Sequence, residues 1–267
     1  MLHAVKLVIN GMDKRKQAWW IIGGSVAFLG ALLISKAVLT PPPVCDPAIK
    51  SKTVILLDYS EQVSTQTMDS IISRAWKLIE EEVPEGEQVS VYSLSKATKK
   101  DFKPLFSACK PRKTGSRTTE DVKRIRREFD EKFMKPLRAE LSVPIPGSDE
   151  SPIAQALIDL SLDDLRFRSS EVTRLAVFSD FMENTSKFSM YKCSNPMESI
   201  NQFRASRIGA VERPKFKNVD VHMHIIPRTN ISKPALQCRD KFWMWFFGDN
   251  EGTCKKDSCL SPDHLPG

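Results

Sequence analysis

The sequence predicts an α/β domain built on a doubly wound, mainly parallel sheet, and three observations support this prediction. Residues 53–60 (TVILLDYS) place four apolar side chains directly before a carboxylate and a hydroxyl, a pattern typical of a buried central strand. Residues 174–180 (RLAVFSD) repeat the pattern. Strand-like runs alternate with helix-like runs between and after these stretches, as expected for right-handed β–α–β connections.

The helices are predicted from apolar residues at intervals of three and four positions. Thr65 can cap the first helix, and Asp121 lies in capping position for a long helix beginning at Thr118, which Pro136 should kink or end. Ser151-Pro152 is a cap followed by proline at the first helical position. Two more helices are expected around 197–205 and at 233–247.

Further strands are predicted at 88–94, 102–108 and 219–226. Pro104 demotes the second of these to an edge position, since proline cannot donate a hydrogen bond to a neighbouring strand. These elements fill one globular domain, in keeping with a chain of 267 residues and 41% hydrophobic composition.

The N-terminal region predicts a membrane anchor. Residues 18–35 carry no charge, and Lys6, Lys14, Arg15 and Lys16 precede them. Such a length can cross a hydrocarbon core, and the cationic flank keeps the N-terminus in the cytoplasm. Ser35-Lys36-Ala37 resembles a cleavage site, so a removed signal peptide is the alternative. The predicted organisation is a cytoplasmic N-terminus (1–17), a transmembrane anchor (18–39), a Pro-rich linker (40–51), the α/β domain (52–248) and a Cys-containing tail (249–267), with the domain periplasmic or extracellular.

Six cysteines in an exported domain favour disulfides over free thiols, and their spacing does not suit zinc. Cys193 and Cys238 each follow a strand, so both belong to the top of the sheet, and we predict a bond between them. The remaining four belong to the bottom and their pairing stays open: Cys45, Cys109, Cys254 and Cys259.

The net charge of +7 is concentrated between Lys110 and Arg138, where eleven Lys or Arg face five Asp or Glu. Nucleic acid, anionic lipid or an acidic protein could meet such a cluster. Acidic residues alternate with the basic ones at helical spacing, which favours a solvated helix face over a nucleic-acid partner.

Small oxygen-bearing side chains follow the strands and precede one helix: Asp58, Ser60, Ser151 and Asp180. If their loops meet above the sheet, two carboxylates and two hydroxyls suit Mg²⁺, Ca²⁺ or Mn²⁺ rather than zinc. The alternative is that the aspartates only cap the following helices.

In order and spacing, these residues resemble the metal-ion-dependent adhesion site of the von Willebrand factor type A domain family. The match spans roughly 52–247: Asp58-Tyr59-Ser60 for its D-x-S-x-S motif, Ser151 for its threonine, and Asp180 for the aspartate of its T-D-G turn. The resemblance implies a binding module whose metal accepts a carboxylate from a protein partner. Gln62, Ser151 and Phe181 depart from the family pattern, which has serine, threonine and glycine there.

The apolar run at 242–247 surrounds a helix on all sides, more than one core-facing stripe needs. Burial by the C-terminal tail is one interpretation, and a partner or membrane-surface contact is the other. The candidate contact residues are Phe242, Trp243, Trp245 and Phe246.

The sequence therefore favours a membrane-anchored binding or scaffold module over an enzyme. A structural subunit of an envelope assembly with a vestigial metal site is one alternative. A metal-assisted phosphohydrolase using Asp58 is the other, although such enzymes need a second aspartate where this chain has Ser60.

Overall fold

A computed structural model describes residues 45–49, 51–58, 60, 63–94, 103–116, 119–143, 148–163, 173–214, 216, 219–248 and 261–264. No helix in these ranges is long and apolar enough to cross a membrane. The predicted anchor at 18–39, Tyr59, Gln62, Cys254 and Cys259 lie outside them.

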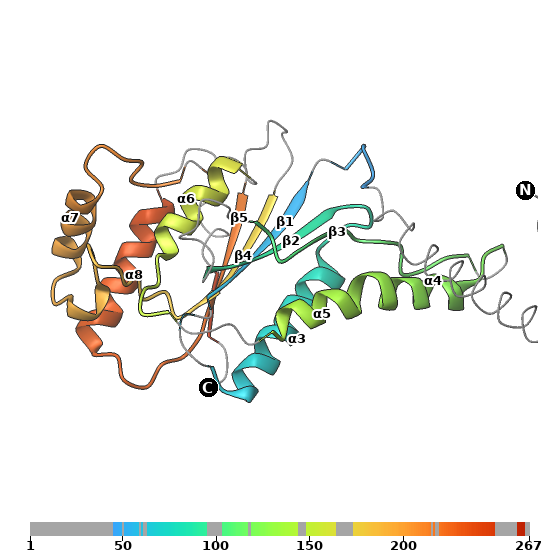
Figure 1. The fold of residues 1–267 in the computed structure, drawn as a ribbon, viewed down its shortest axis with the longest axis horizontal. Coiled ribbons are helices and arrows are strands. Elements are labelled where there is room, and N and C mark those ends of the chain that lie inside the picture. Colours follow the sequence, from blue (N-terminus) through green and yellow to red (C-terminus); the bar gives the residue numbers. More distant parts are fainter. Residues whose placement is uncertain are drawn as a thin grey trace, which may run out of the picture. The chain divides into compact units, whose positions relative to one another are not determined.

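The domain is built on a six-stranded sheet with the order β3-β2-β1-β4-β5-β6. Figure 1 labels β1 to β5 of this sheet. All neighbouring strands pair in parallel except β2 and β3, which are antiparallel at the edge. This order of β1 to β6 is that of a doubly wound α/β sheet, so the predicted fold class is confirmed. The strands are β1 (Lys52–Leu57), β2 (Gln88–Ser93), β3 (Phe106–Cys109), β4 (Thr173–Ser179), β5 (Val219–Ile225) and β6 (Ser261–His264).

Helices cover both faces of the sheet (Figure 1). Side chains alternate along a strand, so Val54 and Leu56 of β1 join one core whereas Ile55 and Leu57 join the other. The second core also contains residues of α3, α4 and α5, and the first contains residues of α6, α7 and α8. The helices are α3 (Thr65–Glu81), α4 (Val122–Phe129), α5 (Lys135–Leu141), α6 (Ile153–Asp163), α7 (Pro196–Ser206) and α8 (Lys233–Gly248).

Three helix details differ from the sequence prediction. The long helix begins at Val122, with Asp121 as its N-cap, rather than at Thr118. Ser64, rather than Thr65, caps α3 by accepting the backbone N–H of Thr67 at 3.1 Å. Pro136 does not end its helix, because the π-helical turn η2 (Asp130–Met134) joins α4 to α5. The wider π turn accommodates the proline ring, which would clash with a carbonyl in an ordinary α-helix.

β6 is the strand that sequence analysis missed. It lies within the predicted tail and pairs in parallel with β5, from His222 opposite Ser261 to Ile225 opposite His264. Its sequence, SPDH, contains a proline and no β-branched residue, Phe, Tyr or Trp, so propensity gives no sign of a strand. Pairing with β5 at the sheet edge determines its conformation.

Two disulfides lie in the described part of the chain. Cys193 and Cys238 are bonded, with their Cα atoms 6.3 Å apart, as predicted. Cys45 is bonded to Cys109, which gives one pairing within the bottom group that the sequence left open. The first bond joins the segment before α7 to α8.

The aromatic run of α8 is part of the core, which corrects its interpretation as a contact surface. Phe242, Trp243 and Phe246 are fully buried against the sheet and α7. The buried residues of α8 recur at helical intervals, so the helix is amphipathic and buries one face although the run is apolar throughout. Trp245 is partly exposed and packs beneath the Arg213 guanidinium, 4.9 Å from its ring centre.

Candidate functional site

The candidate site lies where the sheet reverses its winding direction, between β1 and β4. In open α/β sheets, ligands bind at this switch point, outside the carboxyl ends of the strands. Asp58 directly follows β1 and Asp180 directly follows β4. The Asp58 N–H donates to the Phe178 carbonyl at 2.8 Å and so continues the parallel pairing into the site.

The Asp58 carboxylate is buried and accepts three hydrogen bonds from the described residues. Its Oδ1 accepts the Ser60 backbone N–H at 3.1 Å. Its Oδ2 accepts the hydroxyls of Ser151 at 3.0 Å and Ser179 at 2.6 Å. These donors replace the hydration that a buried carboxylate loses.

Backbone contacts fix the two loop serines beside Asp58. Ser151 forms a two-bond bridge with Asn184, at 2.7 and 3.1 Å, immediately before α6. The Ser148 N–H donates to the Ser60 carbonyl at 2.8 Å. Three separate loops are therefore joined at one point, and the structure brings Asp58, Ser60 and Ser151 together as the sequence predicted.

Asp180 contributes the second carboxylate, and both of its oxygens accept hydrogen bonds. Oδ1 accepts the Met182 N–H at 2.9 Å, and Oδ2 accepts Nε of Arg228 at 3.1 Å. Burial and then repulsion from Asp58 raise the pKa of Asp180 to about 6, although the bonds from Met182 and Arg228 oppose the rise.

Ser179 and Phe181 belong to the site but were not predicted as site residues. The Ser179 hydroxyl accepts the Phe181 N–H at 2.8 Å while donating to Asp58. Phe181 has a φ of 59°, the left-handed region that glycine adopts most readily. The family resemblance indicated this position, because Phe181 replaces the glycine of the T-D-G turn.

Glu183 is a further buried carboxylate that sequence analysis missed. Its Oε2 accepts the Ala154 N–H at 2.8 Å in the first turn of α6, where a negative charge is favoured. Burial nevertheless raises the pKa of Glu183 to about 8. It lies in the loop after β4, and no motif marks it. Its bond to α6 fixes the helix that follows Ser151.

The donors at this edge fit a hard divalent cation. In the described ranges, no three Asp, Glu, His or Cys side chains form a group that could hold a metal ion. A cation here would therefore need serine hydroxyls as well as carboxylates. Asp58, Ser60, Ser151 and Asp180 supply only oxygen donors, which suits Mg²⁺, Ca²⁺ or Mn²⁺.

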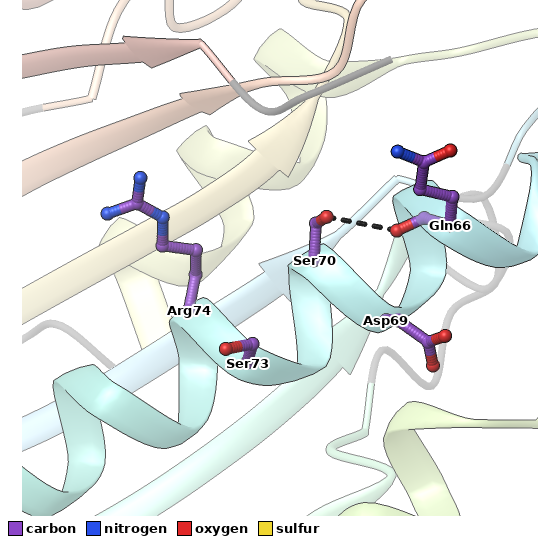
Figure 2. A pocket seen from close by; sticks show the side chains of 5 residues that line it. All are labelled: Gln66, Asp69, Ser70, Ser73 and Arg74. Carbon is purple, nitrogen blue, oxygen red and sulfur yellow. Dashed lines mark hydrogen bonds between the residues drawn. The ribbon is translucent and has the colours of Figure 1, made fainter.

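A separate hollow of about 570 Å³ lies on the outer side of α3. Figure 2 shows the side chains that line it. The described residues that line it all come from this one helix and recur on one face: Gln66, Asp69, Ser70, Ser73 and Arg74. The Ser70 hydroxyl donates to the Gln66 carbonyl of the preceding turn. The hollow contains none of the residues around Asp58.

Comparisons of the sequence with models of protein families and with characterised proteins give no match. Among solved structures, the chain is similar to the ArnB paralog VWA2 from Sulfolobus acidocaldarius, with 12% identity, a TM-score of 0.39, and coverage of 73% of this chain and 40% of that chain. It is similar to the pilus adhesin SpaC from Lactobacillus rhamnosus GG in its open conformation, with 7% identity, a TM-score of 0.42, and coverage of 84% and 29%. It is also similar to the human COPII-coat protein Sec24c, with 8% identity, a TM-score of 0.32, and coverage of 82% of this chain and 30% of that chain. The chain thus spans less than half the length of each.

Proposed function

We propose that this chain is a membrane-anchored, exported binding module with a von Willebrand factor type A-like domain. It engages a protein partner at the carboxyl edge of its sheet and uses a divalent cation, with Mg²⁺ as the first choice and Ca²⁺ or Mn²⁺ as the others. Residues 1–17 are cytoplasmic, 18–39 cross the membrane, and the domain lies in the periplasm or outside the cell.

One observation supports this proposal above the others: three loops converge at the switch point of the sheet. Their polar side chains face one another, as the hydrogen bonds from Ser151 and Ser179 to Asp58 demonstrate. Aspartates that served only as helix caps would bond to their own helices. Asp58 instead bonds to side chains 93 and 121 positions away in sequence.

The same geometry favours binding over phosphoester hydrolysis. A carboxylate nucleophile needs an oxygen that can approach the substrate. Asp58 is 3% exposed, and both of its oxygens already accept hydrogen bonds. A phosphatase assay with Mg²⁺ tests this choice, and turnover that Asp58→Asn abolishes would favour the enzyme.

The cofactor is tested by thermal unfolding. A cation that relieves repulsion between Asp58 and Asp180 binds only the folded chain, so it stabilises the fold increasingly with concentration. We expect the melting temperature to rise with Mg²⁺ or Mn²⁺ in the wild-type chain and to stay constant in Asp58→Ala. A wild-type melting temperature that ignores millimolar Mg²⁺ would count against the cofactor.

The binding function is tested by capture from native membranes with the full-length chain. Asp58→Asn changes the site, whereas Asp69→Asn makes the same change on the exposed side of α3 and serves as the control. We expect proteins captured by the wild type and by Asp69→Asn to be lost with Asp58→Asn. Undiminished capture by a folded Asp58→Asn variant would favour the structural subunit with a vestigial site.

The topology is tested with protease added outside intact cells or spheroplasts. The cationic flank before residue 18 predicts export of the domain, so external protease should digest it. Protection of the domain would reverse the proposed orientation.

A further inference from the structure

Arg228 lies beside the proposed cation site and belongs to the segment that follows β5. It follows the end of β5 by three residues, and its Nε donates to Asp180 Oδ2 at 3.1 Å. The two side chains are only 16% and 3% exposed. This is therefore a sheltered ion pair rather than a surface contact, and little screening by solvent is expected.

The negative charges of Asp58 and Asp180 are stabilised in different ways. Asp58 is surrounded by hydroxyl and amide donors, which carry no net charge. Asp180 has the positive charge of Arg228 on its carboxylate. Arg239 approaches only the Asp180 backbone carbonyl, at 3.5 Å. Within the described part of the chain, Arg228 thus provides beside Asp180 the positive charge that a metal ion would otherwise supply.

A divalent cation and a guanidinium compete for such a carboxylate. Both stabilise the ionised form of Asp180, and their like charges repel strongly at contact distance in a buried place. Coordination by Asp180 Oδ2 would place the metal ion within contact distance of Arg228 Nε, which donates to the same oxygen. Repulsion between the two positive charges in this buried place therefore favours release of the guanidinium when the metal ion binds.

We infer that Arg228 is a built-in counter-ion that sets the cation affinity of the site, so that a divalent cation binds only by displacing its guanidinium from Asp180. This inference rests on the proposed function, because it concerns the same site. Its consequence is a site that remains folded without metal and fills only at a high cation concentration.

The test is a calorimetric titration of Mn²⁺ alone into the full-length chain in detergent. A hydrogen bond to a charged group contributes enough that Arg228→Gln should bind Mn²⁺ at least about tenfold more tightly than wild type. Arg228→Lys keeps the charge and should stay near wild type. Arg124→Gln removes a charge from the exposed face of α4 and should change nothing. Equal or weaker Mn²⁺ binding by Arg228→Gln would overturn the inference.

Stability provides a second measurement. Without divalent cation, Arg228→Gln should melt at a lower temperature than wild type, and Mn²⁺ should restore it more than it raises wild type. If Arg228→Gln folds only with Mn²⁺, the inference stands, whereas failure to fold with or without Mn²⁺ would refute it. Absence of Mn²⁺ binding in every variant also refutes it, yet capture lost with Asp58→Asn would still support a binding function. Conversely, if Arg228→Gln binds Mn²⁺ more tightly but Asp58→Asn leaves capture unaffected, the inference about Arg228 stands and the proposed binding function fails.

Discussion

At Phe181, an unfavourable backbone conformation opposes the favourable burial of the ring. Substitutions can separate these two contributions to the free energy of unfolding. Its backbone has a φ of 59°, which costs a residue with a Cβ about 1 kcal/mol relative to glycine. Its ring is fully buried and packs edge-on against Trp243, with centroids 5.6 Å apart. Removing a buried phenylalanine ring costs about 3–5 kcal/mol. Loss of the ring should therefore outweigh relief of the backbone.

Both Phe181→Ala and Phe181→Gly should destabilise the domain, but by different amounts. Alanine loses the ring and keeps the backbone strain, so we expect a loss of about 3–5 kcal/mol. Glycine loses the ring and relieves the strain, so its loss should be smaller by about 1 kcal/mol. Urea unfolding followed by tryptophan fluorescence measures both. An alanine variant as stable as the glycine variant would refute the argument, because alanine is the more stabilising of the two at ordinary positions.

Three further predictions concern buried charge and covalent bonds. The raised pKa of Glu183 means that the folded chain holds this proton more tightly than the unfolded chain does. The contribution of Glu183 to the free energy of unfolding therefore falls as pH rises from 4.5 to about 8. Glu183→Gln should remove this decline, and parallel profiles of stability against pH for wild type and variant would contradict the prediction. Arg174→Met should cost about 3 kcal/mol in urea unfolding because it leaves the buried Glu87 without its ion pair, and a double variant with Glu87→Gln that fails to recover stability would count against this. Replacing Cys193 and Cys238 by serine opens a loop of 45 residues and should cost at most about 4 kcal/mol; a more stable variant would show that the bond strains the fold.

The strands and most helices could be predicted because local patterns determine them. Val54 to Leu57 form a buried central strand, and the residues after β1 and β4 meet because parallel strands end at the same edge. The edge position of β3 was also predicted, from Pro104, although the strand itself begins two residues later, at Phe106, and its antiparallel pairing was not predicted. The predictable part of the site was therefore the set of residues that directly follow the ends of parallel strands.

The remaining features depend on contacts between distant segments. Arg228 reaches Asp180 across 48 positions, and only its place after a strand neighbouring β4 could have indicated it. Glu183 owes its role to the position of α6, which no local motif reveals. The aromatic run left burial and a partner contact open, because six consecutive apolar residues hide which of them face the core. Only packing identifies Met244, at 59% exposed, as the most exposed of the six.

The most direct test of the proposed site is diffraction at the manganese absorption edge from crystals of the full-length chain grown with Mn²⁺ at saturating concentration. The proposal predicts an anomalous peak enclosed by Asp58, Ser60, Ser151 and Asp180, with the Arg228 side chain moved away from the Asp180 carboxylate. A map with no peak among these four residues, in both the wild type and Arg228→Gln, would contradict the proposal.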